Sequence, residues 1–217
     1  MNKSQVVTRI IEAGVVAVIR MKDTNRLVNV IEALRVGGVK SMEITMTVPG
    51  AVDIIRQLSN EVPPDVLIGA GTVVEEETAA KVIDAGATFV VGPVLNLDIV
   101  SLCVRRGVAV MPGCYTPTEI LAGWKAGADI IKVFPATSLG PKYFKDLSGP
   151  FPDIRLMPTG GVTIDNVGEW IAAGACAVGI GSDLLDKKAI EEGRYEVLTE
   201  RAARMVQNVK AEKAKLH

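Results

Sequence analysis

A lysine stands in the middle of one of the most apolar stretches of the chain. Lys132 lies between Ile131 and Val133 in the run 128–136, which follows a glycine and contains Pro135 near its end. Lysine is among the residues that are least often buried, and an ammonium group that loses its hydration has its pKa lowered. A neutral amine in such a pocket can attack a carbonyl carbon and form a Schiff base. The alternative is that the amine reaches water or pairs with a carboxylate.

Glu43 is a second charged residue in an apolar run, and polar neighbours follow it at a spacing of two. Residues 42–47 read M-E-I-T-M-T, so an extended chain places Glu43, Thr45 and Thr47 on one face. A carboxyl group whose pKa is tuned by burial can move protons to and from a carbonyl compound. Glu43 and Lys132 are therefore the predicted catalytic pair, and a structural ion pair is the alternative.

Both residues need a scaffold that brings distant strands together, and the chain has the pattern of one. Eight short apolar runs alternate with helical patterns, and their starts are roughly 20 to 26 residues apart, as in repeated strand–helix units. The runs are 15–20, 40–46, 66–72, 88–91, 108–112, 129–134, 155–159 and 175–180. We predict an α/β, single-domain (β/α)8 TIM barrel over residues 1–217, with a final helix over roughly 188–213. An open doubly wound sheet is the alternative, but no G-x-G-x-x-G follows the first run.

The carboxyl ends of the strands form the active-site face of such a barrel. Polar or small residues near the ends of the runs are the predicted substrate-binding set, namely Arg20, Thr45, Thr47, Thr72, Pro93, Phe134, Thr159, Gly160, Gly161, Gly181 and Ser182. The glycine pair after the seventh run and the Gly-Ser after the eighth are predicted to bind phosphate through backbone N–H groups, with Ser182 opening a helix. The predicted substrate therefore carries phosphate at one end and a carbonyl at the other.

Composition excludes several other kinds of protein. The net charge is -1, with 24 basic and 25 acidic residues and 4% aromatic residues, so nothing favours nucleic-acid binding. There is no signal-peptide pattern at the N-terminus and no run of 18 uncharged apolar residues, so we expect no membrane span. Three widely spaced cysteines fit a reduced, cytoplasmic protein. The sole histidine is the terminal His217, which argues against a histidine base or an imidazole zinc site.

Five segments carry a family resemblance. They read M-E-I-T-M-T-V-P-G-A (42–51), G-A-G-T-V (69–73), I-K-V-F-P-A (131–136), P-T-G-G-V (158–162) and A-V-G-I-G-S (177–182). In this order and spacing the chain resembles the 2-dehydro-3-deoxy-phosphogluconate (KDPG) aldolases, also called 4-hydroxy-2-oxoglutarate (KHG) aldolases. The resemblance covers nearly the whole chain, and its motifs are specific only as a set.

The resemblance implies a class I aldolase that cleaves KDPG to pyruvate and glyceraldehyde 3-phosphate, with cleavage of 4-hydroxy-2-oxoglutarate to pyruvate and glyoxylate as a second reaction. By this resemblance Lys132 is the Schiff-base lysine and Glu43 the proton-transfer residue. Thr72 matches a position that contacts the pyruvate part of the substrate, and Gly161 and Ser182 match phosphate-binding positions. The family is typically trimeric and needs no metal, so the resemblance implies a homotrimer with no cofactor beyond the lysine imine.

The chain departs from the family pattern at Thr47. Some relatives carry an arginine there that contacts the substrate carboxylate. Arg20, at the end of the first run, is expected to supply the cation instead, and the departure leaves the substrate range open.

Two other functions stay open at this point. One is a phosphosugar isomerase or epimerase on the same barrel, with Glu43 as base and Lys132 as an electrostatic stabiliser. The other is a non-catalytic sensor of phosphate ligands in which the lysine only pairs with Glu43. Neither the preferred 2-keto-3-deoxy acid nor its stereochemistry at C4 follows from the sequence.

Overall fold

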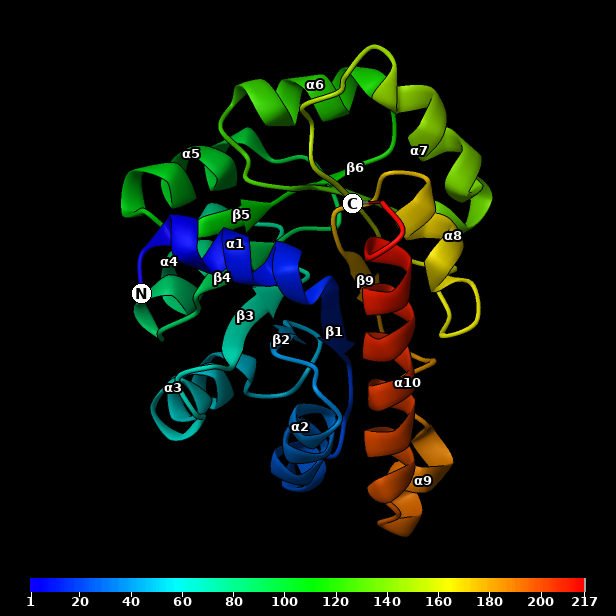
Figure 1. Ribbon diagram of the computed structural model, residues 1–217. Helices are drawn as coiled ribbons and strands as arrows, with labels where there is room; N and C mark the ends of the chain where they lie inside the picture. Colours follow the sequence, from blue (N-terminus) through cyan, green and yellow to red (C-terminus); the bar gives the residue numbers. More distant parts are fainter. Residues whose placement is uncertain (217) are drawn as a thin grey trace.

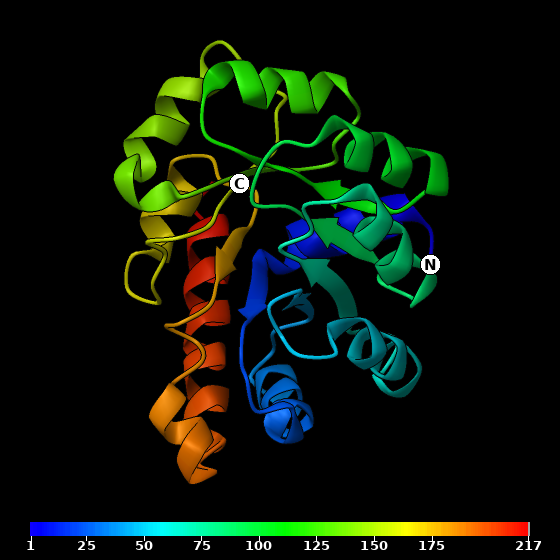
Figure 2. The ribbon, with the colours of Figure 1, turned by 180° about the vertical axis from the view of Figure 1, so that it is seen from behind.

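The computed structural model describes residues 1–216, and His217 lies outside the described residues. Its parallel strands form two sheets, shown from both sides in Figures 1 and 2. The larger sheet has the order β5-β4-β3-β2-β1-β9, with β1 at Val15–Ile19, β2 at Ser41–Thr45, β3 at Leu67–Gly71, β4 at Phe89–Val91, β5 at Ala109–Met111 and β9 at Val178–Ile180. The smaller sheet has the order β6-β7-β8, with β6 at Gly113–Cys114, β7 at Ile131–Val133 and β8 at Leu156–Pro158.

Backbone contacts join the two sheets into one ring. On one side, parallel bridges pair Leu156 with Ala175 and Thr159 with Gly179, which connects β8 to β9. On the other side, the backbone N–H of Asp129 donates to the Val110 carbonyl across 3.1 Å, and the chain itself runs from β5 into β6. The predicted α/β barrel fold is therefore confirmed.

One predicted strand is divided in two. The run 108–112 was expected to be a single strand, but the structure has β5 before Pro112 and β6 after it. β5 pairs with β4, whereas β6 pairs with β7. The Pro112 carbonyl accepts a hydrogen bond from the backbone N–H of Lys132 at 3.0 Å. Because proline has no N–H to donate, it suits the place where the strand leaves one partner for the other.

Helices cover the outside of the ring and one of its ends (Figures 1 and 2). Those that follow the strands are α2 (Leu27–Val36), α3 (Ala51–Glu61), α4 (Glu76–Asp84), α5 (Leu97–Arg106), α6 (Pro117–Lys125), α7 (Gly140–Ser148) and α8 (Val167–Ala172), with short 3-10 turns at Thr24–Arg26 and Ala136–Ser138. α1 (Lys3–Ala13) precedes β1 and packs Val6, Val7 and Ile10 against the interior residues Val16 and Leu67. It therefore closes the amino-terminal end of the barrel and leaves the carboxyl ends of the strands as the mouth.

The predicted final helix over roughly 188–213 is two helices. α9 (Lys187–Glu192) ends at Gly193, whose φ of 72° is left-handed, and α10 (Glu196–Lys213) follows. A glycine in this conformation is a common helix stop because it has no Cβ to clash. The packed face of α10 consists of Leu198, Ala202, Met205 and Val209, which are buried, with Val197 and Val206 half-buried beside them.

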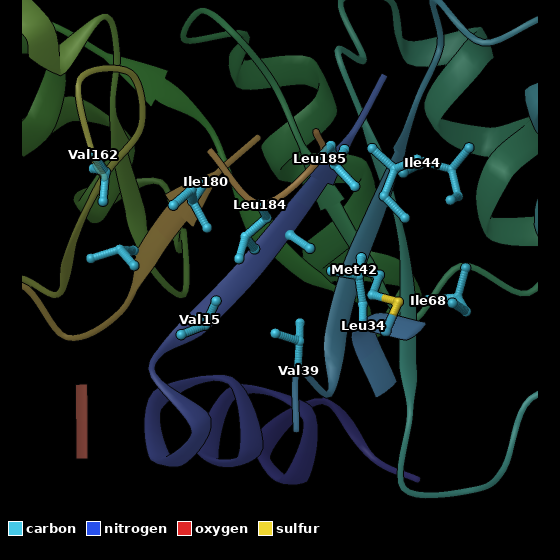
Figure 3. Packing of buried hydrophobic residues seen from close by; sticks show 14 of the residues in the cluster. Val15, Leu34, Val39, Met42, Ile44, Ile68, Val162, Ile180, Leu184 and Leu185 are labelled. Carbon is cyan, nitrogen blue, oxygen red and sulfur yellow. The ribbon is translucent and has the colours of Figure 1, made fainter. Parts of the chain in front are cut away.

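The two faces of β2 show how the strands divide their side chains. Met42 and Ile44 belong to the layer between strands and helices, where Leu34 of α2 also packs (Figure 3). Alternation along the strand then aims Ser41, Glu43 and Thr45 into the barrel. Within residues 1–216, no helix is long and apolar enough to cross a membrane.

Candidate active site

Lys132 reaches the barrel interior from β7. Its neighbours Ile131 and Val133 pack in the outer layer, while Ile130 packs in the interior cluster, so the alternation turns the lysine inward. The residue is 5% exposed, and its Nζ lies 5.1 Å from the centre of the Phe134 ring. Among residues 1–216, no carboxylate lies within ion-pair distance of this amine and none hydrogen-bonds to it. The side chain is thus buried, and its amine lies beside an aromatic ring without a fixed partner.

Glu43 enters the same interior from the opposite wall, on β2, and is 1% exposed. Neither carboxyl oxygen has a hydrogen-bond partner within the described chain. Burial raises the pKa of Glu43, and the positive charges of Lys132 and Arg20 act in the opposite direction. A carboxyl group in this setting can take up and release a proton without first breaking an ion pair. This geometry gives no support to the structural ion pair that was the alternative.

Three polar residues at the ends of β1 and β2 lie near this carboxyl. Arg20 follows β1 and is exposed, yet its charge still acts on Glu43. Thr45 is fully buried, Thr47 is exposed, and their Oγ1 atoms hydrogen-bond to each other at 2.7 Å. A cation at the rim and a threonine pair below it can both contact a carboxylate at the mouth.

The loop after β3 holds a strained residue. Thr72 has a φ of 59°, in the left-handed region. This conformation costs a residue with a Cβ roughly 1–2 kcal/mol, and such strain is found preferentially at functional sites. Thr72 and Pro93 are both half-buried, and Pro93 lies so close to Gly113 that only glycine fits there. The backbone thus holds Thr72 at the mouth at a cost in stability.

The loops after β8 and β9 lie together. Gly160 and Gly161 have left-handed φ angles of 89° and 76°. The two loops are joined because Asp183 Oδ2 accepts the backbone N–H of Ile164 at 2.6 Å. Thr159, before the glycine pair, is 8% exposed, and its Oγ1 has no partner in the described chain. The predicted phosphate-binding residues are therefore brought together.

One detail of that prediction is wrong. Ser182 was expected to open a helix, but it opens a turn in which the N–H groups of Leu184 and Leu185 donate to the Gly181 carbonyl at 3.1 and 3.0 Å. The next helix, α9, begins only at Lys187. The structure therefore offers turn N–H groups at this loop in place of a helix N-terminus.

Sequence reasoning missed two interior residues. Ser41 is fully buried on the same face as Glu43, and its Oγ has no partner within residues 1–216. The spacing of two was the signal that could have found it. Gly71 lies against the Glu43 carboxyl, since a Cβ there would come within 2.7 Å of Cδ. No set of three or more His, Cys, Asp or Glu residues gathers as a metal site in the described part of the chain.

A parallel α/β barrel whose mouth holds a buried lysine and a buried carboxyl, both without partners, is the architecture of an enzyme that acts on a carbonyl compound. Comparison with known proteins narrows this class. The family model "Aldolase: KDPG and KHG aldolase" matches residues 6–201. The chain therefore belongs to the KDPG and KHG aldolase family, and it is a class I aldolase, a carbon–carbon lyase.

Individual relatives are similar to this chain along most of their length. The chain is 36% identical to 2-dehydro-3-deoxy-phosphogluconate aldolase of Pseudoalteromonas atlantica, a match that covers 90% of this chain and 91% of the relative. It is 34% identical to KHG/KDPG aldolase of Escherichia coli K12, over 90% of this chain and 92% of the relative. A solved KDPG aldolase from Legionella pneumophila, with pyruvate captured as a covalent carbinolamine intermediate, superposes with a TM-score of 0.85 at 29% identity, covering 92% of this chain and 97% of that one.

Proposed function

We propose that this protein cleaves KDPG to pyruvate and glyceraldehyde 3-phosphate, and that 4-hydroxy-2-oxoglutarate is a second substrate, cleaved to pyruvate and glyoxylate. The observation that carries the proposal is the placement of two buried residues, Lys132 and Glu43, on opposite walls of one barrel mouth, with no ion pair between them in the described chain. The two proposed substrates, KDPG and KHG, are those for which the relatives are named. The carbinolamine seen in the Legionella enzyme supports a lysine that bonds to the ketone.

The reaction begins when the amine of Lys132 adds to the C2 ketone. Glu43 gives a proton to the resulting hydroxyl, which leaves as water, and a protonated imine forms. The C4 hydroxyl then gives its proton to the Glu43 carboxylate while the C3–C4 bond breaks. The electron pair of that bond moves into the imine, so the aldehyde departs and an enamine is left on the lysine. Glu43 returns the proton to C3, and hydrolysis of the imine releases pyruvate and the free amine.

The rim residues would hold the two ends of the substrate. Arg20 binds the carboxylate in place of the arginine that Thr47 replaces, and Thr72 contacts the pyruvate part. Gly161 and Ser182 bind the phosphate through loop N–H groups and the serine hydroxyl. The other predicted contacts are Thr45, Pro93, Phe134, Thr159, Gly160 and Gly181.

We also infer that the enzyme is a cytoplasmic homotrimer that needs no metal. A strip of exposed apolar residues, Val74, Val94 and Leu97, supports contact between copies. The segments that carry these residues are joined, because Asn96 Nδ2 donates to the Val74 carbonyl at 3.1 Å. Light scattering on a size-exclusion column tests the trimer, and a monomer at micromolar concentration would contradict it.

Pyruvate release from a panel of 2-keto-3-deoxy acids, with and without phosphate, tests the reaction. We expect turnover of the phosphorylated gluconate form that survives treatment with EDTA. Loss of activity in EDTA would refute the metal-free mechanism. Conversion of a ketose phosphate without pyruvate release would refute aldol cleavage and favour the isomerase alternative.

A further inference from the structure

Gly71, the last residue of β3, provides the space that the Glu43 carboxyl fills. A Cβ built on Gly71 would lie 2.7 Å from Cδ of Glu43 and 3.2 Å from its Cγ, and closer still to Oε1. Carbon atoms in contact are normally about 3.5–4.0 Å apart. The end of the Glu43 side chain therefore occupies the volume that any side chain at position 71 would take.

The backbone gives no reason of its own for a glycine at this position. The φ of Gly71 is not among the positive values in the chain, and the residue is paired in an ordinary parallel ladder opposite Thr45. A glycine that is paired in a strand often marks a close approach of another group. Here that group is the Glu43 carboxyl.

The pairing of β2 with β3 shows where along the barrel the Glu43 carboxyl lies. Glu43 is paired with Gly69, whose missing side chain is filled by the Phe89 ring, with Cζ 2.5 Å from the position of a Cβ. The carboxyl of Glu43 instead lies against Gly71, two residues further along β3 toward the mouth. Below it the interior is packed with Leu67 and Phe89, which are 1% and 0% exposed.

We propose that Gly71 is a positioning residue for the aldolase reaction, because the space it leaves holds the Glu43 carboxyl at the barrel mouth. The inference rests on the proposed function and adds a residue that does not itself touch the substrate. A methyl group at position 71 would meet the flexible end of Glu43, not the backbone. The fold can therefore accommodate Gly71→Ala by displacing the Glu43 carboxyl, and the rate of proton transfer by that carboxyl then falls.

The test separates proton transfer from imine formation. Gly71→Ala is compared with wild type for deuterium exchange into the methyl group of pyruvate and for end-point trapping of pyruvate with borohydride. A misplacement of about 1 Å can cost on the order of 100-fold in rate. We expect exchange and aldol turnover to fall roughly 10- to 100-fold by that reasoning, while the trapped fraction at the end point stays near the wild-type value.

Two further variants make the result specific. Gly149→Ala is the matched control, because a Cβ there would meet no atom closer than 3.9 Å, and it should exchange deuterium at the wild-type rate. In a Glu43→Ala background the space beside position 71 is empty, so Gly71→Ala should have no further effect on exchange. If Gly71→Ala alone fails to fold, adding Glu43→Ala should restore folding.

Each adverse result points to one claim. Wild-type protein that is not trapped by pyruvate and borohydride refutes the proposed function itself. Wild-type protein that is trapped, together with a Gly71→Ala variant that exchanges at the wild-type rate, refutes only the positioning role. An equal loss of exchange in the Glu43→Ala background, or a failure to fold there, refutes it as well.

Discussion

Replacing Lys132 with methionine should abolish imine formation and at the same time stabilise the fold. The lysine is 5% exposed and its amine has no ion pair or hydrogen bond within the described chain. An amine held in this way destabilises the folded state, because water solvated it fully in the unfolded chain. Methionine has a similar length and no polar group that needs a partner.

The size of the effect follows from two opposing contributions. Burying a polar group without a partner costs about 1–3 kcal/mol, and this is an upper bound for the Lys132 amine, which is not fully shielded from solvent. The contact of Nζ with the Phe134 ring at 5.1 Å offsets roughly 1 kcal/mol of this cost. Lys132→Met should therefore raise the free energy of unfolding by up to about 2 kcal/mol. For a domain of this size, that corresponds to a rise in Tm of up to roughly 8 °C.

Urea unfolding near pH 7 measures this directly, with the midpoint expected to rise while the slope m stays constant. Lys142→Met is the control, since that side chain is 87% exposed and its pairing with Asp146 at 3.9 Å is weak. The control should change stability by less than about 0.5 kcal/mol. A Lys132→Met variant that is less stable than wild type would refute the claim that the buried amine lacks a stabilising partner.

Three other substitutions test the rest of the site. Burial raises the pKa of Glu43 above 4.5, so the stabilising contribution of its protonated form is complete below about pH 4.5 and is lost as the pH rises through the raised pKa. The stability gained by Glu43→Gln should therefore be near zero in acid and grow toward neutral pH in a series of urea titrations. A gain that is independent of pH would contradict this. Gly69→Ala should destabilise the fold by about 1–3 kcal/mol, because its methyl group would press on the fully buried Phe89 ring; unchanged thermal stability would show that the ring can move aside. Arg20→Ala should raise KM for KDPG on the order of tenfold or more with a smaller change in kcat, since a charge-assisted contact to the substrate carboxylate is lost; steady-state kinetics with an unchanged KM would assign the carboxylate to another residue.

Much of the site could be predicted from the sequence because it depends on local periodicity. The spacing of two in M-E-I-T aims Glu43 inward on β2, and the same alternation around Lys132 aims the amine inward on β7. Both strands carry apolar residues on their other face, so a slip of one residue would have buried the charges among the helices. That penalty makes the inward placement predictable without coordinates.

The features that escaped prediction depend on contacts between strands. The division of the fifth run at Pro112 arises where the closing ring changes partners, and the turn at Ser182 depends on the Gly181 carbonyl. The position of the Glu43 carboxyl against Gly71 depends on the register of β2 with β3 and on the Phe89 ring that fills the neighbouring gap. Register across the whole ring sets these contacts, and no single segment encodes them.

The most direct test of the mechanism is to incubate the protein with pyruvate, reduce it with borohydride and map the modified peptide by mass spectrometry. We expect one reduced pyruvate adduct per chain, located on Lys132 and lost in Lys132→Met. An unmodified protein, or an adduct on another lysine that survives in Lys132→Met, would contradict the assignment of Lys132 as the Schiff-base residue.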